Sequence, residues 1–379
     1  MVSSPESFPA GGRLTVDLVA LSANWKALAD HVTGGGHATA AVVKGDGYGI
    51  GLEEAGRALA AAGCTTFFVA LPDEGRRLRA ILPNAVVYVL NGLIGGAEAY
   101  ARADLRPVLG SWPEIEEWLA FRRAGGTTGA AIHVDTGMNR LGLSLHEALD
   151  LKREARLLAT LAPDLVISHL ACADTPDNPM NRRQLALFRE VRAQFPDLPA
   201  SLANSAGVFL GPDYHFDLVR PGIALYGGVA VLGVTNPMRA VATLEARVLA
   251  VREAEEGETV GYGATQSMKM NARLAILSIG YADGYHRLAG AANEHGGAWV
   301  WVRGHRAPLV GRVSMDLITI DVTNIPGVVR GDWAEMFGRH IPVDEVARHA
   351  GTIGYELLTN LGRRHERVYV GGADETHRA

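Results

Sequence analysis

The stretch Thr39-Ala40-Ala41-Val42-Val43-Lys44-Gly45-Asp46-Gly47-Tyr48-Gly49 gives the strongest indication of both fold and chemistry. A short apolar run, typical of a buried strand, ends at a lysine, and a glycine-rich turn with a tyrosine follows. A partly buried lysine can lose its proton and attack a carbonyl carbon, whereas arginine stays protonated. The stretch therefore predicts a Schiff-base lysine at a strand end, beside glycine backbone that an anion can approach.

Further apolar runs alternate with amphipathic stretches along the first part of the chain. The strand-like runs are Thr39–Val43, Thr65–Ala70, Ala85–Leu90, Arg106–Leu109, Ala130–Val134, Leu165–His169, Pro199–Ala203 and Phe216–Val219. The helical patterns include Leu52–Ala62, Glu74–Leu82, Trp112–Arg123, Leu145–Leu161 and Asn181–Gln194. This alternation predicts an α/β fold, a (β/α)8 TIM-like barrel over residues 20–235. An open doubly wound sheet is the alternative, disfavoured because no G-x-G-x-x-G turn follows the first strand.

The pattern changes after Gly233. Strand-like segments such as Arg239–Ala250 and Arg273–Ile279 follow one another without regular helices, apart from a helical piece near Val343–Leu361. We therefore expect residues 236–379 to form a mostly β domain. Residues 1–19 are assigned to it as well, because a strand-like segment there precedes a helix that we place at Ser22–His31, with Ser22 as its N-cap.

Composition excludes several classes of protein. The formal net charge of -5 argues against a nucleic-acid-binding or membrane-surface role. Two cysteines are too few for a disulfide framework or a thiolate metal site, and we expect no metal. Met1–Gly12 lacks the features of a signal peptide, and no apolar run is long enough to span a bilayer, so we expect a cytoplasmic protein.

Polar residues follow the predicted strands at their carboxyl ends, where a barrel of this type builds its active site. They are Lys44, the segment Asp135–Arg140, His169, Asn204-Ser205 and Arg220-Pro221-Gly222. Taken alone, His169 is more often a structural histidine and Arg140 a surface ion pair. Their common position on one face favours an active site, and Ser205 with Gly222-Ile223 adds a weak indication of an anion site.

Together these motifs resemble alanine racemases, the fold-type III family of pyridoxal-phosphate enzymes. The barrel motifs are Ala41–Lys44 with Tyr48, Asp135–Met138 with Arg140–Gly142, Ser168-His169, Asn204–Ala206, Arg220–Ile223 and Tyr226-Gly227. Those of the second domain are Gly261–Thr265, Gly280–Gly284 and Gly311–Asp316. The motifs keep the family's order over nearly the whole chain.

The resemblance implies a role for each matching residue. The two catalytic bases would be Lys44, which also binds pyridoxal 5'-phosphate covalently, and Tyr262, supplied by the second subunit of a homodimer. The other cofactor-binding residues would be Tyr48, Arg140, His169, Ser205, Arg220, Gly222 and Ile223. The substrate would meet Arg140, the backbone N–H of Met315, and Tyr281 at the entrance.

Two positions depart from the family's pattern. His133 stands where the family often has a lysine that carries a carbamate, so Arg140 must be positioned by something else, such as a bound anion or His133 itself. Arg363 stands where the family usually has a tyrosine at the cofactor phosphate. Arg363 would either bind the phosphate in its place or be a surface residue.

The implied activity is two-base racemisation of L-alanine to D-alanine, for peptidoglycan synthesis or for alanine breakdown. One alternative is a racemase or decarboxylase of the same fold acting on another amino acid, such as a broad-specificity racemase that accepts serine. Another is a non-enzymatic cofactor-binding protein. The second domain with Tyr262 argues against the last, since a carrier needs no opposing base.

Overall fold

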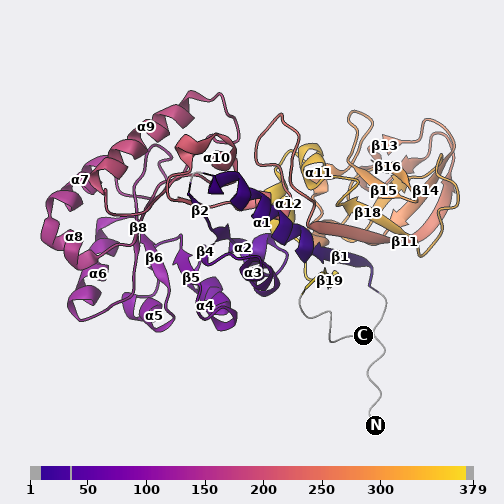
Figure 1. The fold of residues 1–379 in the computed structure, drawn as a ribbon. Helices are drawn as coiled ribbons and strands as arrows, with labels where there is room; N and C mark the ends of the chain where they lie inside the picture. Colours follow the sequence, from indigo (N-terminus) through magenta and orange to yellow (C-terminus); the bar gives the residue numbers. More distant parts are fainter. Residues whose placement is uncertain (1–9, 35, 373–379) are drawn as a thin grey trace, which may run out of the picture. The chain divides into compact units, whose positions relative to one another are not determined.

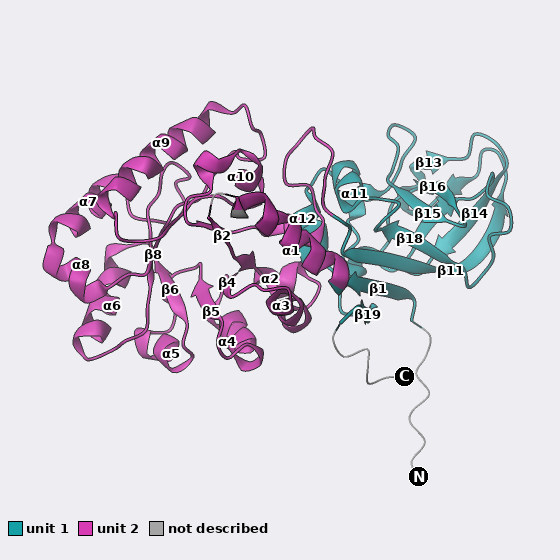
Figure 2. Cartoon of the chain, viewed as in Figure 1, with its two compact units in different colours: residues 1–18, 239–379 teal, residues 19–238 magenta. Residues whose placement is uncertain are grey.

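The computed structural model describes residues 10–34 and 36–372, which fall into two compact units (Figure 2). Unit 2 is Val19–Met238, and unit 1 combines Met1–Leu18 with Arg239–Ala379. Residues 1–9, which include most of the stretch Met1–Gly12, lie outside the described residues, as do 35 and 373–379.

Unit 2 is built on a parallel sheet of seven strands in chain order, and its helices α4 to α9 lie around the outside of the strands (Figure 1). The strands are β3 (Ala41–Val42), β4 (Thr66–Val69), β5 (Val86–Val89), β6 (Arg106–Leu109), β7 (Ala131–His133), β8 (Leu165–Ile167) and β9 (Ala200–Ser201). Most of their residues are buried, which matches the continuous apolar runs of a sheet covered on both faces.

Backbone hydrogen bonds from an eighth segment close this sheet. β10 (Leu218–Val219) pairs in parallel with β2 (Ala38–Thr39), which lies just before β3. The N–H of Val42 donates to Pro221 O at 3.0 Å, and the N–H of Arg220 donates to Ala203 O at 2.9 Å. The β10 segment therefore bonds to both ends of the seven-stranded sheet, and the predicted barrel is confirmed.

The helices of unit 2 mostly match the predicted amphipathic stretches. They are α1 (Leu18–Thr33), α2 (Lys44–Tyr48), α3 (Leu52–Ala61), α4 (Pro72–Ile81), α5 (Ala97–Arg102), α6 (Trp112–Arg123), α7 (Leu145–Arg153), α8 (Ala155–Leu161), α9 (Pro179–Gln194), α10 (Ser205–Phe209), η1 (Pro212–Tyr214) and η2 (Ile223–Tyr226).

Two expectations about these helices were wrong. Ser22 is not an N-cap: α1 begins at Leu18, directly after a strand, and the Ser22 hydroxyl donates to Ala58 O at 3.3 Å. The single helix predicted over Leu145–Leu161 is two helices, because Glu154 has a non-helical backbone (φ −82°, ψ 67°) that separates α7 from α8.

Unit 1 contains an eight-stranded sheet that is antiparallel except for one pair. Its order is β14-β17-β16-β15-β18-β11-β1-β19, and β14 also pairs with β11. The strands are β1 (Gly12–Asp17), β11 (Ala242–Ala254), β14 (Ala272–Leu277), β15 (Trp299–Val302), β16 (His305–Val310), β17 (Ile318–Asp321), β18 (Trp333–Phe337) and β19 (Glu366–Val370). A register shift between Val248 and Ala250 lets the long β11 pair with β1 and β18 near its start and with β14 near its end.

The remaining elements of unit 1 are short. They are β12 (Thr259–Val260), β13 (Gln266–Ser267), η3 (Tyr262–Ala264), η4 (Tyr281–Asp283), η5 (Arg287–Ala289), α11 (Val343–His349) and α12 (Gly354–Thr359). β11 alternates buried and half-buried residues over its first half, so one of its faces is packed inward. The largely β character predicted for this part of the chain is confirmed.

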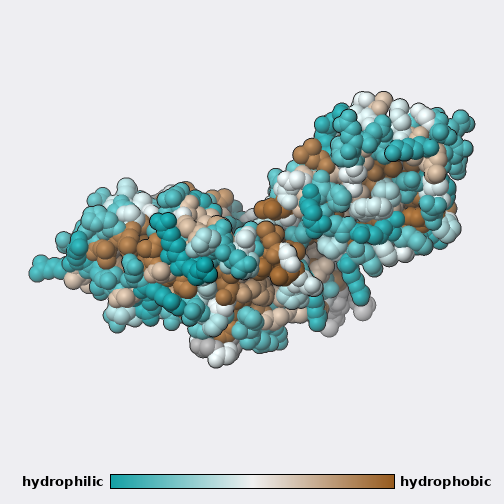
Figure 3. Space-filling view, turned by 90° about the horizontal axis from the view of Figure 1, so that it is seen from above, coloured by the Kyte–Doolittle hydropathy of each residue, from teal (hydrophilic) through white to brown (hydrophobic). Residues whose placement is uncertain are grey.

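The visible face of each unit is mainly hydrophilic, with smaller apolar groups between (Figure 3). Within the described residues, no helix is both long and apolar enough to cross a bilayer.

Candidate active site

Lys44 follows β3 and opens a turn whose backbone winds left-handed. All five residues 45–49 have positive φ, between 53° and 84°. Glycine adopts this conformation readily, but Asp46 and Tyr48 carry side chains, and each costs on the order of 1–2 kcal/mol there. The surrounding structure must therefore hold this turn in place.

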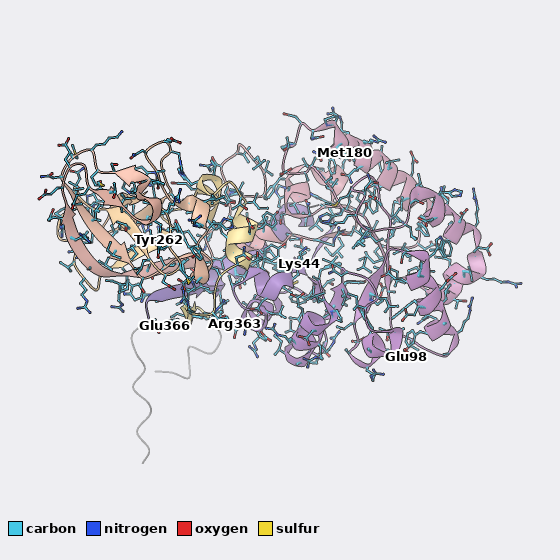
Figure 4. The ribbon with its side chains drawn as sticks, turned by 180° about the vertical axis from the view of Figure 1, so that it is seen from behind. Lys44, Glu98, Met180, Tyr262, Arg363 and Glu366 are labelled. Atoms are coloured by element: carbon cyan, nitrogen blue, oxygen red, sulfur yellow. The ribbon has the colours of Figure 1, made fainter. Side chains whose placement is uncertain are left out.

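The Lys44 side chain is half-buried within unit 2, where Figure 4 labels it. Burial, followed by the positive charge of Arg140, lowers the pKa of its amine, and the negative charge of Glu74 opposes this shift. A lowered pKa makes the neutral, nucleophilic amine more accessible near neutral pH.

The Ser205 hydroxyl, the Tyr48 hydroxyl and the backbone of residues 222–224 lie close together beside this turn. The Ser205 hydroxyl oxygen accepts the N–H groups of Gly222 at 2.7 Å and Ala224 at 3.3 Å. The Tyr48 hydroxyl fills the space next to Gly222, since a Cβ on Gly222 would lie only 2.1 Å from it. Tyr48 is buried and stacks on Tyr226, with ring centroids 4.5 Å apart. Two hydroxyls and backbone N–H groups thus face one small region.

This region fits a bound phosphate group. The N–H of Ile223, the first residue of η2, donates no hydrogen bond within the described residues. Hydroxyls and backbone N–H groups at the start of a helical turn are the donors that phosphate oxygens accept. The close approach of Tyr48 also requires glycine at position 222.

Arg220 lies fully buried among neutral acceptors. Its guanidinium donates to the Ser201 hydroxyl and to Ser168 O, both at 2.5 Å, and lies 3.5 Å from His169 Nδ1. No carboxylate of the described chain forms an ion pair with it. Burial lowers the pKa of Arg220 to about 9, so it is still positively charged at neutral pH.

The charge of Arg220 also affects the neighbouring histidines. Burial, followed by the charge of Arg220, holds the pKa of His169 well below its ordinary value and lowers that of His133 to about 4. Both imidazoles are therefore neutral near neutral pH.

The loop after β7 presents Arg140 at the surface of unit 2. The Asp135 carboxylate accepts the N–H groups of Gly137, Met138 and Asn139, each at 2.8 Å, and this shapes the loop. Arg140 is exposed and makes no hydrogen bond within the described residues, although its charge lowers the pKa of Lys44 and of both neighbouring histidines. Arg140 is thus available to bind an anion near Lys44.

The remaining predicted site residues belong to unit 1. Tyr262, labelled in Figure 4, is 70% exposed and opens η3 between Gly261 and Gly263, which both have positive φ (75° and 77°). This turn presents the tyrosine to solvent rather than to the core of its own unit.

The segments of Tyr281 and Met315 lie side by side. The N–H of Tyr281 donates to Ser314 O at 3.1 Å, and the N–H of Ala282 donates to Met315 O at 3.0 Å. A Cβ at position 280 would lie 2.2 Å from Met315 O, so glycine is required there. Met315 is exposed, and its own N–H donates no hydrogen bond within the described residues.

An arginine that the sequence did not single out joins these two segments. Arg364 donates to Asp283 at 2.8 Å and to Asp316 at 2.9 Å. Its neighbour Arg363 is exposed and forms no hydrogen bond or ion pair within the described part of the chain. The predicted alternatives for Arg363, a phosphate ligand or a surface residue, stay predictions.

Sequence reasoning also missed Glu74 and Ser201. Ser201 bonds Arg220, and Glu74 binds the backbone of the turn after Lys44. Glu74 follows a proline at the start of α4, a recognisable helix-start pattern. Ser201 gave no such signal. Among residues 10–34 and 36–372, no three His, Cys, Asp or Glu side chains are arranged to hold a metal ion.

Comparison with known proteins agrees with this geometry. The family models for the N-terminal and C-terminal domains of alanine racemase match residues 16–230 and 241–369. An alanine racemase of Rhizobium meliloti is 50% identical over 98% of this chain and 100% of its own length. A biosynthetic alanine racemase of Agrobacterium fabrum is 53% identical over 94% of this chain and 93% of its own.

A solved structure extends the agreement to the fold. The alanine racemase of Bartonella henselae, crystallised with covalently bound pyridoxal phosphate, superposes with a TM-score of 0.89. It is 40% identical, and the match covers 96% of this chain and 100% of that one. The predicted enzyme family is therefore confirmed, and this chain belongs to the alanine racemase family.

Proposed function

We propose that this enzyme interconverts L-alanine and D-alanine with pyridoxal 5'-phosphate bound to Lys44. The main observation that supports this proposal is the position of the Lys44 amine. It is half-buried at the end of β3 and its pKa is lowered. Tyr48, from the turn that follows Lys44, lies against Gly222, whose N–H donates to the Ser205 hydroxyl. Membership of the family and the covalently bound cofactor of the Bartonella relative support the assignment.

Different residues would hold the phosphate and the ring of the cofactor. Tyr48, the Ser205 hydroxyl and the N–H of Ile223 would hold the phosphate, together with the Gly222 N–H once a phosphate oxygen replaces Ser205 as its acceptor. Arg220 would face the ring nitrogen with His169 behind it. Pyridoxal phosphate, when bound, supplies an electron-withdrawing ring that makes the Cα–H bond of an amino acid acidic.

Arg220 determines how strongly that ring can withdraw electrons. A carboxylate at this position would keep the ring nitrogen protonated, whereas Arg220 offers only N–H donors and has no site that accepts a proton. Arg220 would therefore leave the ring nitrogen of a bound cofactor unprotonated, and the ring would withdraw electrons more weakly. Arg220 should therefore favour rapid return of the proton to Cα over side reactions such as transamination.

Racemisation needs one group that removes the Cα proton and another that delivers a proton on the opposite face. Lys44 and Tyr262 are the proposed pair. They belong to different compact units, and Tyr262 is largely exposed on its own unit. We infer a homodimer in which Tyr262 of one subunit serves Lys44 of the other.

The substrate carboxylate requires donors close to Lys44. Arg140 supplies a guanidinium without a hydrogen-bond partner in the described chain, and the N–H of Met315 is likewise available. Tyr281 would narrow the entrance and favour a methyl side chain.

Chiral analysis tests the proposal. Purified protein loaded with pyridoxal phosphate is incubated with L-alanine and, in parallel, L-serine. Rapid D-alanine with slow D-serine is expected. No D-alanine from cofactor-loaded protein would refute the proposal, and D-serine at an equal rate would replace strict alanine specificity with a broad one.

A further inference from the structure

The left-handed turn 45–49 is held by a residue from another βα unit. Glu74 Oε1 accepts the N–H of Gly45 at 2.7 Å and that of Asp46 at 3.3 Å. Its second oxygen accepts the N–H groups of Ala70 at 2.9 Å and Leu71 at 3.1 Å, at the end of β4. One carboxylate therefore joins the first two residues after Lys44 to the neighbouring strand.

The same helix holds the turn at a second point. Arg77, one turn further along α4, donates to the Asp46 carboxylate at 2.8 Å and pairs with Glu53 at 2.7 Å. Asp46 also accepts the N–H of Leu52 at 3.4 Å. These contacts stabilise a non-glycine residue in the left-handed region.

A second βα unit of this protein uses the same arrangement without a lysine beside it. Glu114 near the start of α6 accepts the N–H of Leu93 at 2.8 Å through one oxygen and the N–H of Gly110 at 2.9 Å through the other. It thus joins a loop after β5 to the end of β6. The loop that it holds carries no predicted site residue, so Glu114 is a matched control for Glu74.

We propose that Glu74 is a positioning residue for Lys44: its carboxylate fastens the turn 45–49 to the end of β4 and places a negative charge beside the lysine amine. The first role fixes the backbone from which both Lys44 and Tyr48 project. The second opposes burial and Arg140, which together lower the pKa of Lys44. The consequence for catalysis rests on the proposed function, in which Lys44 carries the cofactor.

The variant Glu74→Gln removes the charge and half of the hydrogen-bond acceptors at nearly constant side-chain size. Glutamine has nearly the same size, but only its oxygen can accept, and its NH2 group would face two N–H donors. Loss of the charge should lower the pKa of Lys44 further, and loss of two accepted hydrogen bonds should loosen the turn. A merely structural role, as for Glu114, would affect stability alone.

The test uses the full-length protein without cofactor. The amines are acetylated over a pH series, and mass spectrometry gives the labelling midpoint of the peptide that contains Lys44, with Lys26, Lys152 and Lys269 as internal references. We expect Glu74→Gln to move the Lys44 labelling midpoint to lower pH than in the wild type, because the charge that opposes burial and Arg140 is lost. The same variant should also raise the Kd for pyridoxal phosphate about tenfold. Glu114→Gln should leave both values as in the wild type.

Equal Lys44 midpoints and equal cofactor Kd values in the two variants would overturn the proposal, whatever their stability. If Glu74→Gln does not fold, Glu74→Asp replaces it in the test, because aspartate keeps the charge but its side chain is one methylene group shorter. Hydrogen exchange at the Gly45 and Asp46 amides should then be faster than in the wild type, and unchanged protection would count equally against the role. Failure of the wild type to bind the cofactor at Lys44 would refute the proposed function instead, and would leave the labelling comparison valid.

Discussion

Gly222→Ala should weaken cofactor binding by steric means alone. The backbone at position 222 has φ −123°, so alanine introduces no left-handed strain there. Its new Cβ, however, would lie 2.1 Å from the Tyr48 hydroxyl and 2.9 Å from the ring carbon that carries it. One of the proposed phosphate donors must therefore move.

The size of the effect follows from the packing. To regain an ordinary contact of 3.4 Å, the hydroxyl must shift by about 1.3 Å, the difference between 3.4 and 2.1 Å. Tyr48 is 6% exposed and stacked on Tyr226, so little room is available. Overpacking of this kind lowers the free energy of unfolding by about 1–3 kcal/mol. Loss of one hydrogen bond to a charged phosphate should raise the Kd for pyridoxal phosphate about 10- to 100-fold.

Absorbance titration of the cofactor-free protein with pyridoxal phosphate measures the Kd, and denaturant unfolding measures stability. Gly34→Ala is the control, because no atom lies within 4 Å of a Cβ at that position. The double variant with Tyr48→Phe should recover part of the stability but not the affinity. A Gly222→Ala protein that binds the cofactor as tightly as the wild type would show that Tyr48 and Gly222 do not form the phosphate site.

The other predictions concern acid stability and subunit sharing. Burial lowers the pKa of His133 to about 4 from 6.5, so the unfolded chain binds more protons between these values, and stability is lost as the pH falls from 6.5 to 4. Between pH 6.5 and pH 4, the free energy of unfolding of His133→Asn, measured by denaturant titration, should therefore fall by about 3 kcal/mol less than that of the wild type. An equal fall in both proteins would contradict the lowered pKa of His133. Inactive Lys44→Ala and Tyr262→Ala proteins are mixed under conditions where subunits exchange. If the two subunits share their sites, up to about a quarter of all sites become intact and that fraction of the wild-type activity returns. No recovery would rule out shared sites.

The barrel could be predicted from local sequence because its strands are apolar runs that end at polar or glycine residues. The strand Arg106–Leu109 and the helix Trp112–Arg123 have the predicted bounds. The break at Glu154 could not be foreseen, since neither glycine nor proline marks it. The start of α1 was misplaced because the helix follows its strand without a loop, so no capping residue marks the boundary.

The sequence predicted the strand-end residues of the candidate site but not the residues that hold them in place. Strand-end positions indicated Lys44 and Arg220 because parallel strands place their carboxyl ends on one face. The groups that hold them, Glu74 and Ser201, come from other βα units, and only the tertiary structure brings them into contact. The left-handed backbone of Tyr48 was likewise hidden, since tyrosine has no preference for it.

The sheet order of unit 1 has a consequence for biosynthesis. β1 lies between β11 and β19, so residues 12–17 find their two partners only at residues 242–246 and 366–370. During translation the barrel segment emerges between them and can fold first, while β1 stays an unpaired strand with open edges. Its second edge is covered only after residues 366–370 have left the ribosome. We therefore expect nascent chains that stall before β19 to be the species most dependent on chaperones and most prone to aggregate.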